Sequence, residues 1–134
     1  MRTYARLTAR EMFRYQAGTY CVDGIDINRA LLVTIANSGQ FGNGARVAPS
    51  ARVDDGLLDL VIFEESTRLR AIATIPRFFT GGFEQVKGVT VRRIERVTIS
   101  ADRPMTFHVD GEPVVGGTTL EGRVLPSALR VAVR

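Results

Sequence analysis

The sequence predicts a mainly β domain, a β-sandwich with two α-helices. From residue 19 to residue 134, short runs rich in β-branched and aromatic residues follow one another, and turn residues separate nearly all of them. Only residues 3–16 and the region after Ser66 show helical spacing. The 134 residues, 45% of them hydrophobic and only one a cysteine, describe one globular domain, residues 1–134, without a disulfide.

The first predicted element is an amphipathic helix over residues 3–16. Its apolar residues recur at three- and four-residue spacing, and four arginines, each four apart, line another face: Arg2, Arg6, Arg10 and Arg14. Most of the net charge of +4 lies here. Such a row is typical of a solvated face, but it also suits anionic lipid headgroups or a partner protein.

Eight short runs carry the β signal and follow this helix. Alternation of apolar and polar residues is clearest around Ile99 and Phe107, which indicates strands with one buried face. Between the third and fourth runs, a second helix is expected to begin near Ser66-Thr67 and to end at Gly81-Gly82, with Pro76 kinking it or beginning a second turn. The predicted strands cover residues 20–22, 30–36, 58–63, 89–92, 96–100, 105–109, 119–125 and 129–133.

Three Asp-Gly pairs, Asp23-Gly24, Asp55-Gly56 and Asp110-Gly111, punctuate the strands. A tight turn that needs a positive φ explains all three. Near the second pair, Asp54, Asp55 and Asp59 place three carboxylates within six residues. This density causes repulsion unless a cation, an arginine or open water compensates it, and Mg²⁺ suits such oxygens.

The third pair lies in the segment Thr106–Glu112, which carries two acids at a strand end. The Gly111 turn is expected to present Glu112 beside Asp110, where a carboxylate could serve as a general base. A polar hairpin turn without a catalytic role explains the same residues. His108 has no second histidine or cysteine nearby to share a metal, which favours an outward-facing strand residue.

Other chemistries find less support in the sequence. The glycine-rich stretch 37–44 lacks the Lys-Ser/Thr ending of a P-loop, no Ser-His-Asp arrangement stands out, and the few scattered aromatics disfavour nucleic-acid binding. No apolar run approaches the length of a membrane-spanning helix, and the first residues lack a signal peptide's apolar centre. We therefore expect a cytoplasmic protein, with peripheral membrane contact as an option.

Six short motifs, taken together and in order, resemble the C-terminal domain of the diacylglycerol kinase and sphingosine kinase superfamily, and most of all its bacterial soluble lipid kinases. The similarity runs from about Tyr4 to Arg134. The motifs are Asn37-Ser38-Gly39, Gly42-Asn43-Gly44, Ala48-Pro49-Ser50-Ala51, Asp54-Asp55-Gly56-Leu57-Leu58-Asp59, Asp110-Gly111-Glu112 and Leu125-Pro126-Ser127-Ala128-Leu129.

This resemblance implies the C-terminal β-sandwich of the NAD kinase/diacylglycerol kinase-like fold, in a two-domain enzyme that moves the γ-phosphoryl group of ATP to a lipid hydroxyl. Asp110 matches the family's general base, and Glu112 matches its neighbour in the site. Asp55 matches a position that holds Mg²⁺, with backbone carbonyls near Arg52 and Leu57 as further ligands. The motifs fit the lipid branch better than the related NAD kinases.

The chain also departs from the family pattern. It contains no Gly-Gly-Asp-Gly-Thr nucleotide motif, so ATP is expected to bind an N-terminal nucleotide-binding domain outside this chain, which alone should be inactive. Asn43 replaces a usual glycine, and strands that normally precede the first helix are missing, which predicts an open sheet edge and a homodimer. The alternative is a non-catalytic β-rich module whose arginine-rich helix docks on an anionic membrane or a partner protein.

Overall fold

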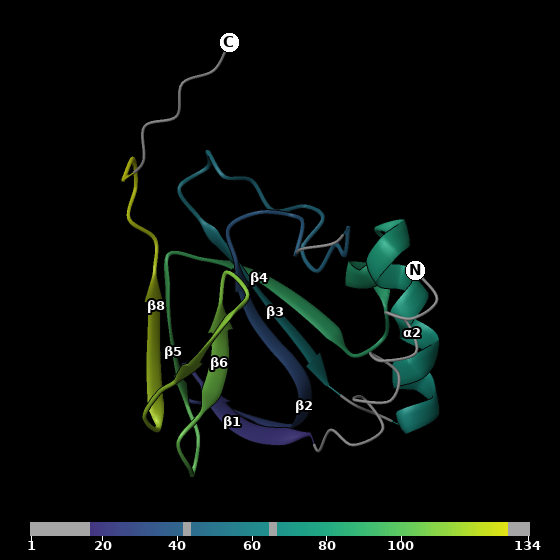
Figure 1. The fold of residues 1–134 in the computed structure, drawn as a ribbon, viewed down its shortest axis with the longest axis horizontal. Helices are drawn as coiled ribbons and strands as arrows, with labels where there is room; N and C mark the ends of the chain where they lie inside the picture. The colour runs from purple at the N-terminus through teal and green to yellow at the C-terminus, as the bar shows by residue number, and fades with distance from the viewer. Residues whose placement is uncertain (1–16, 42–43, 65–66, 129–134) are drawn as a thin grey trace.

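The computed structural model of the chain describes residues 17–41, 44–64 and 67–128. The predicted helix over residues 3–16, the predicted strand over residues 129–133 and Asn43 lie outside these ranges. The described residues form antiparallel strands with one α-helix, α2 (Arg68–Thr80), and one short 3₁₀ turn, η1 (Phe83–Gln85) (Figure 1).

Six strands make one antiparallel sheet in the order β4-β3-β2-β1-β5-β8. A separate hairpin of β6 (Thr106–Val109) and β7 (Glu112–Val115) follows β5 in the chain. The strands of the large sheet are β1 (Gly18–Val22), β2 (Ile25–Ala36), β3 (Leu58–Glu64), β4 (Val89–Ile94), β5 (Arg96–Ser100) and β8 (Thr119–Arg123).

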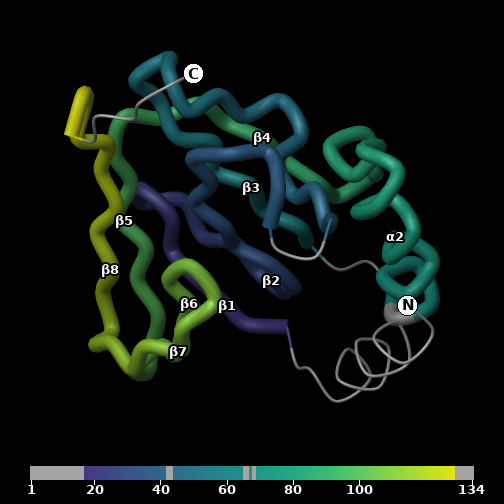
Figure 2. Tube along the Cα trace, turned by 45° about the horizontal axis from the view of Figure 1, so that its top comes forward, coloured from purple at the N-terminus to yellow at the C-terminus, as the bar shows by residue number. Residues whose placement is uncertain are grey.

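Strand β3 lies at the centre of the core and is buried on both faces. Leu60 and Ile62 pack with residues of β1, β4 and β5, and Met105 at the foot of the β6–β7 hairpin packs against the same cluster. Val61 points to the other face and packs with Ala71 of α2 and with Phe83 of η1. The continuous apolar run in β3 follows from this double burial, and α2 and the hairpin lie on opposite sides of the sheet (Figure 2).

Gly122 in β8 shows how the sheet curls back on itself. A Cβ at this position would lie 2.7 Å from Cδ1 of Ile35, although β1 and β5 separate β8 from β2 in the sheet. A larger residue at position 122 would require the Ile35 side chain to shift. Strand β8 therefore folds over β2, and Leu120 of β8 packs against the Leu60 cluster, which gives the β-sandwich-like architecture that the sequence predicts.

Most predicted elements are present, with two corrections. Thr67 caps α2 through a hydrogen bond from the Arg70 amide, and Gly81 ends the helix at a φ of 76°, as expected. Of the two alternatives at Pro76, a second turn is wrong because the helix continues through this residue, and a kink stays a prediction. This continuation is tolerated because Pro76 is exposed, so water can solvate the carbonyl that loses its partner.

The second correction is β7, which pairs with β6 although no strand was expected between residues 109 and 119. The apolar alternation of β6 does not continue into β7, whose four residues are all exposed. No helix in the described part of the chain is long and apolar enough to cross a membrane.

Candidate functional site

Two of the three Asp-Gly pairs form the same kind of turn. Asp23 and Gly24 have φ angles of 49° and 81°, and they join the paired residues Val22 and Ile25. Asp110 and Gly111 have φ angles of 50° and 92°, and they join Val109 and Glu112. Two successive positive φ angles in a two-residue hairpin are typical of the tight turn that Asp-Gly favours. At the remaining pair, only Gly56 has a positive φ, of 72°, and the loop leads into β3.

The β6–β7 hairpin presents Asp110 and Glu112 to solvent. Asp110 occupies the first turn position and Glu112 begins β7, and both are exposed. Nδ1 of His108 lies 3.3 Å from the carbonyl oxygen of Gly111, so the imidazole closes the turn from the strand before it. Among the described residues, no side-chain hydrogen bond or ion pair engages either carboxylate. Both acids can therefore accept a proton or a hydrogen bond from a bound molecule.

Exposed valines lie near these two acids in the hairpin. Val109 is 52% exposed and Val115 is 81% exposed, while Val114, opposite Phe107 in the ladder, is 36% exposed. An exposed group of valines on a polar hairpin is unusual, because strands normally turn such residues toward a core. Val109 and Val114 share the face of Glu112 in the ladder, whereas Val115 lies on the other face of the hairpin.

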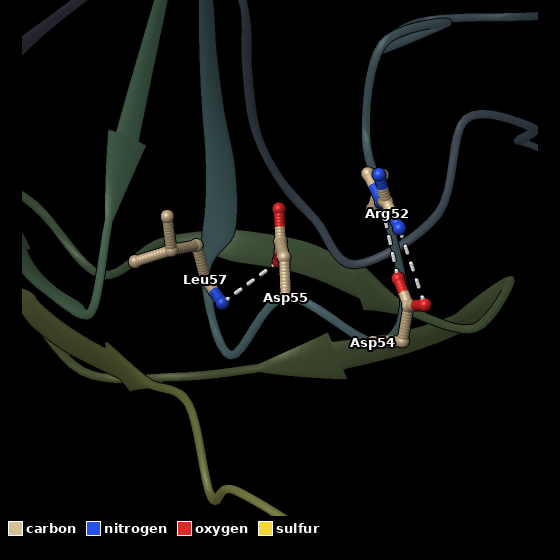
Figure 3. A network of polar contacts seen from close by, with 4 residues as sticks. All are labelled: Arg52, Asp54, Asp55 and Leu57. Atoms are coloured by element: carbon tan, nitrogen blue, oxygen red, sulfur yellow. Dashed lines mark hydrogen bonds and ion pairs between the residues drawn. The ribbon is translucent and has the colours of Figure 1, made fainter.

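The second candidate site is the loop before β3, where Arg52 and Asp54 pair with each other (Figure 3). Nε of Arg52 donates to Oδ1 of Asp54 at 3.2 Å, and Nη2 donates to Oδ2 at 3.3 Å. This hydrogen-bonded guanidinium lowers the pKa of the Asp54 carboxyl. Both side chains are exposed and satisfied by each other, so Asp54 is not available as a cation ligand in this conformation.

Asp55, by contrast, has one carboxylate oxygen without a partner. Oδ1 accepts a hydrogen bond from the Leu57 amide at 3.0 Å, whereas Oδ2 is buried and has no hydrogen-bond donor among the described residues. Figure 3 shows Asp55 turned toward Leu57 and away from the Arg52–Asp54 pair. A buried carboxylate oxygen is costly to leave unpaired. A hard cation would satisfy it, so the donor set of Asp55 and the loop carbonyls fits Mg²⁺.

Asp59 belongs to the strand rather than to the loop. It is 2% exposed, and it lies opposite Arg93 in the β3–β4 ladder. Burial raises the pKa of the Asp59 carboxyl, and the charge of Arg93 partly opposes this rise. In the described ranges, no three acidic, histidine or cysteine side chains gather as a metal cluster. Arg52 pairs with Asp54, and Arg93 lies opposite Asp59. The charge of Asp55 acts on both Arg52 and Asp59, and its unpaired Oδ2 makes Asp55 the cation candidate.

Glu84 in η1 is a supporting residue that the sequence did not reveal. Its carboxylate accepts hydrogen bonds from the Ser50 amide at 3.0 Å and from the Ser50 hydroxyl at 2.7 Å. Gly39 packs against the same loop, because a Cβ there would lie 3.1 Å from the Ala48 carbonyl oxygen. These contacts fix the chain just before Arg52. Ser50 and Glu84 are 34 positions apart, so no local pattern could have linked them.

Comparison with known proteins agrees with this geometry. Residues 2–133 match the family described as the YegS C-terminal NAD kinase beta sandwich-like domain. A "Probable lipid kinase YegS-like" of Pseudomonas fluorescens is 37% identical over 102 residues, which are 75% of this chain and 33% of that protein. A "Probable lipid kinase YegS" of Escherichia coli is 33% identical over 101 residues, again 75% of this chain and 32% of the relative. The chain thus spans about one third of these relatives.

A solved structure supports the fold. A candidate diacylglycerol kinase from Bacillus anthracis superposes with a TM-score of 0.69 at 19% identity, over 92% of this chain and 43% of that one. At this identity the likeness concerns the fold alone. Together with the sequence match over nearly the whole chain, the sheet that curls on itself and the Asp-Gly loops place the protein: it belongs to the YegS C-terminal NAD kinase-like β-sandwich domain family.

Proposed function

We propose that this chain is the C-terminal, general-base-bearing domain of an ATP-dependent lipid kinase, which transfers the γ-phosphoryl group of ATP to the hydroxyl of a diacylglycerol-like or sphingoid lipid. The acceptor hydroxyl loses its proton as it attacks phosphorus, and a carboxylate at hydrogen-bond distance can take that proton. The names of the relatives support a kinase acting on lipids.

The observation that carries this proposal is the exposed Asp110 at the β6–β7 turn. The turn holds the backbone of Asp110 in place, and the described residues leave its carboxylate without a partner. In the proposed reaction, Asp110 accepts the proton of the lipid hydroxyl, and Glu112 lies next to it on the hairpin and keeps the acceptor side of the site acidic. A buried or internally bonded carboxylate would not suit this role.

The surroundings of Asp110 favour a lipid acceptor over NAD. The exposed Val109, Val114 and Val115 offer apolar surface beside the acids. A lipid can cover these valines with its hydrocarbon portion, which removes apolar area from water at about 25 cal/mol per Å². The polar hydroxyl groups and charges of NAD would gain nothing from the same contact.

Asp55 is the residue that we assign to Mg²⁺, with the backbone carbonyls of Arg52 and Leu57 as further ligands. When bound there, Mg²⁺ supplies positive charge that stabilises the acidic loop. Asp55 contributes the unpaired Oδ2, while the Arg52 side chain remains on Asp54. Glu84 and Ser50 hold the preceding loop in position.

ATP is the proposed phosphoryl donor, and a separate N-terminal nucleotide-binding domain is its proposed binding partner. This division follows from the absence of a glycine-rich nucleotide motif in the 134 residues. The lipid acceptor would be taken from a membrane surface, which makes peripheral contact with anionic lipid part of the proposal. This chain by itself is then not expected to phosphorylate a lipid.

A direct assay compares acceptors. The full-length protein that carries this domain should phosphorylate diacylglycerol or a sphingoid base with Mg²⁺-ATP, and should leave NAD unmodified. Asp110→Asn should reduce lipid phosphorylation by about two to four orders of magnitude. Phosphorylation of NAD in preference to every lipid offered would contradict the proposal.

A further inference from the structure

Helix α2 exposes an apolar stripe on its outer side. The face that includes Ala71 packs on Phe83 and on the sheet, while Leu69 on the opposite face is 79% exposed. Ala73 and Pro76, one and two turns further on, are exposed as well, and Phe79 is 42% exposed. A surface helix usually turns polar residues outward. The outer face of α2 therefore carries apolar surface that its own sheet does not cover.

Cationic side chains flank this stripe along one side. Arg70 and Arg77, two turns apart, line a cavity of about 430 Å³ between α2 and the η1–β4 connection, and Lys87 lines its other wall. Nη1 of Arg77 reaches this wall, since a Cβ on Gly82 would lie 3.2 Å from it. Thr74 and Gln85 contribute polar atoms, and none of the described residues that line the cavity is acidic. Such a cavity is suited to a phosphate group.

The distribution of acidic residues also favours the binding of phosphate groups beside α2. Helix α2 contains no Asp or Glu, and the nearest acid of η1, Glu84, is hydrogen-bonded to Ser50 in another loop. An apolar stripe flanked by arginine and lysine without acids is the pattern of a helix that lies in a membrane interface, with its apolar face toward the acyl chains and its cations at the headgroups.

We infer that the outer face of α2 and the adjoining cationic cavity form a docking surface for an anionic membrane. Leu69, Pro76 and Phe79 enter the boundary of the acyl chains, while Arg70, Arg77 and Lys87 bind headgroup phosphates. This surface is distinct from the Asp110 turn, because α2 and the β6–β7 hairpin lie on opposite faces of the sheet (Figures 1 and 2). Its residues also differ from the arginine row of residues 3–16. The inference uses neither Asp110 nor Glu112, so it does not depend on the proposed reaction.

Co-sedimentation of the 134-residue chain with vesicles of equimolar phosphatidylglycerol and phosphatidylcholine tests the cationic part. The triple variant Arg70→Gln, Arg77→Gln, Lys87→Gln should bind about a hundredfold more weakly, because each cation near the surface contributes about a factor of five. A matched triple variant, Arg96→Gln, Arg103→Gln, Arg123→Gln, removes the same charge from exposed positions elsewhere and should bind within about threefold of the wild type, since screening limits distant charges.

A second pair of variants tests the apolar part of the docking surface. Leu69→Gln should weaken vesicle binding by about tenfold, and Leu125→Gln, at another exposed leucine, should leave it unchanged. Circular dichroism confirms that each variant is folded. Equal losses in the two triple variants, or undiminished binding of the α2 variants, would overturn the inference. If the full-length protein lacks lipid kinase activity but still binds vesicles through α2, the proposed reaction is contradicted and the docking surface is supported.

Discussion

The turns at Asp23-Gly24 and Asp110-Gly111 share a dipeptide and a backbone conformation, but their carboxylates have different surroundings. Oδ1 of Asp23 accepts a hydrogen bond from the Thr98 amide at 2.9 Å, and its own amide donates to the Thr98 carbonyl. The first turn is thereby tied to β5. The carboxylate of Asp110 has no such contact in the described part of the chain, and exposed valines lie on the same hairpin.

This difference separates an aspartate with a structural hydrogen bond from one whose carboxylate has no partner among the described residues. Positive φ angles account for the glycine and favour an aspartate before it in both turns. The hydrogen bond to Thr98 gives Asp23 a further structural role. The turn accounts for an aspartate at position 110 through its positive φ, but the described residues give its carboxylate no structural contact.

The largest difference in stability is expected when the two aspartates are truncated. Asp23→Ala should lower the free energy of unfolding by about 2 kcal/mol, because it loses a hydrogen bond and places alanine at a positive φ. Asp110→Ala should cost only about 1 kcal/mol, since only the backbone strain remains. Urea unfolding of the chain measures both values. Equal losses would show that the Thr98 contact contributes nothing.

The remaining Asp-Gly pair, Asp55-Gly56, extends the comparison to metal binding. At tenfold excess of Mg²⁺ over its dissociation constant, the wild-type chain should gain about 1.4 kcal/mol of stability. Asp55→Asn should abolish this gain, whereas Asp54→Asn should retain it, because Asp54 pairs with Arg52. Thermal unfolding with and without Mg²⁺ measures the shift. A gain that survives in Asp55→Asn would place the ion elsewhere.

The smallest effects are expected at the two glycines. Gly24→Ala and Gly111→Ala should each lower the free energy of unfolding by about 1 kcal/mol, because both glycines have a positive φ. A Cβ would meet no atom within 4 Å at either position, so only the backbone strain counts. Losses that differ clearly between these variants would mean that the turns are not equivalent, and the comparison of the aspartates would fail.

Local chemistry explains which parts of the fold were predictable. Alternation and capping located β5 at its observed bounds and α2 between Thr67 and Gly81, because these signals act over a few residues. The exposed β7 has no apolar alternation, so only its pairing with β6 reveals it. The curl of the sheet depends on Gly122 meeting Ile35, which are far apart in the chain.

In the candidate site, too, local sequence signals predict some features and three-dimensional contacts determine the others. The Asp-Gly dipeptides correctly predict turns with a positive φ, and the dense acids of the second pair draw attention to Asp55. The unpaired Oδ2 of Asp55, the Arg52–Asp54 pair and the brace from Glu84 to Ser50 all arise from three-dimensional placement. The carboxylates of the two Asp-Gly turns differ because the Thr98 amide of β5 donates a hydrogen bond to Asp23, whereas Asp110 has no such donor among the described residues.

The most direct test of this account measures turnover in two matched variants of the full-length protein that carries this domain, Asp110→Asn and Asp23→Asn, together with their free energies of unfolding. We predict that Asp110→Asn lowers kcat on the lipid acceptor by about two to four orders of magnitude while its stability stays within about 0.5 kcal/mol of the wild type. Asp23→Asn should keep its kcat. Near wild-type turnover of Asp110→Asn, or an equal loss of turnover in both variants, would contradict the assignment of Asp110 as the general base.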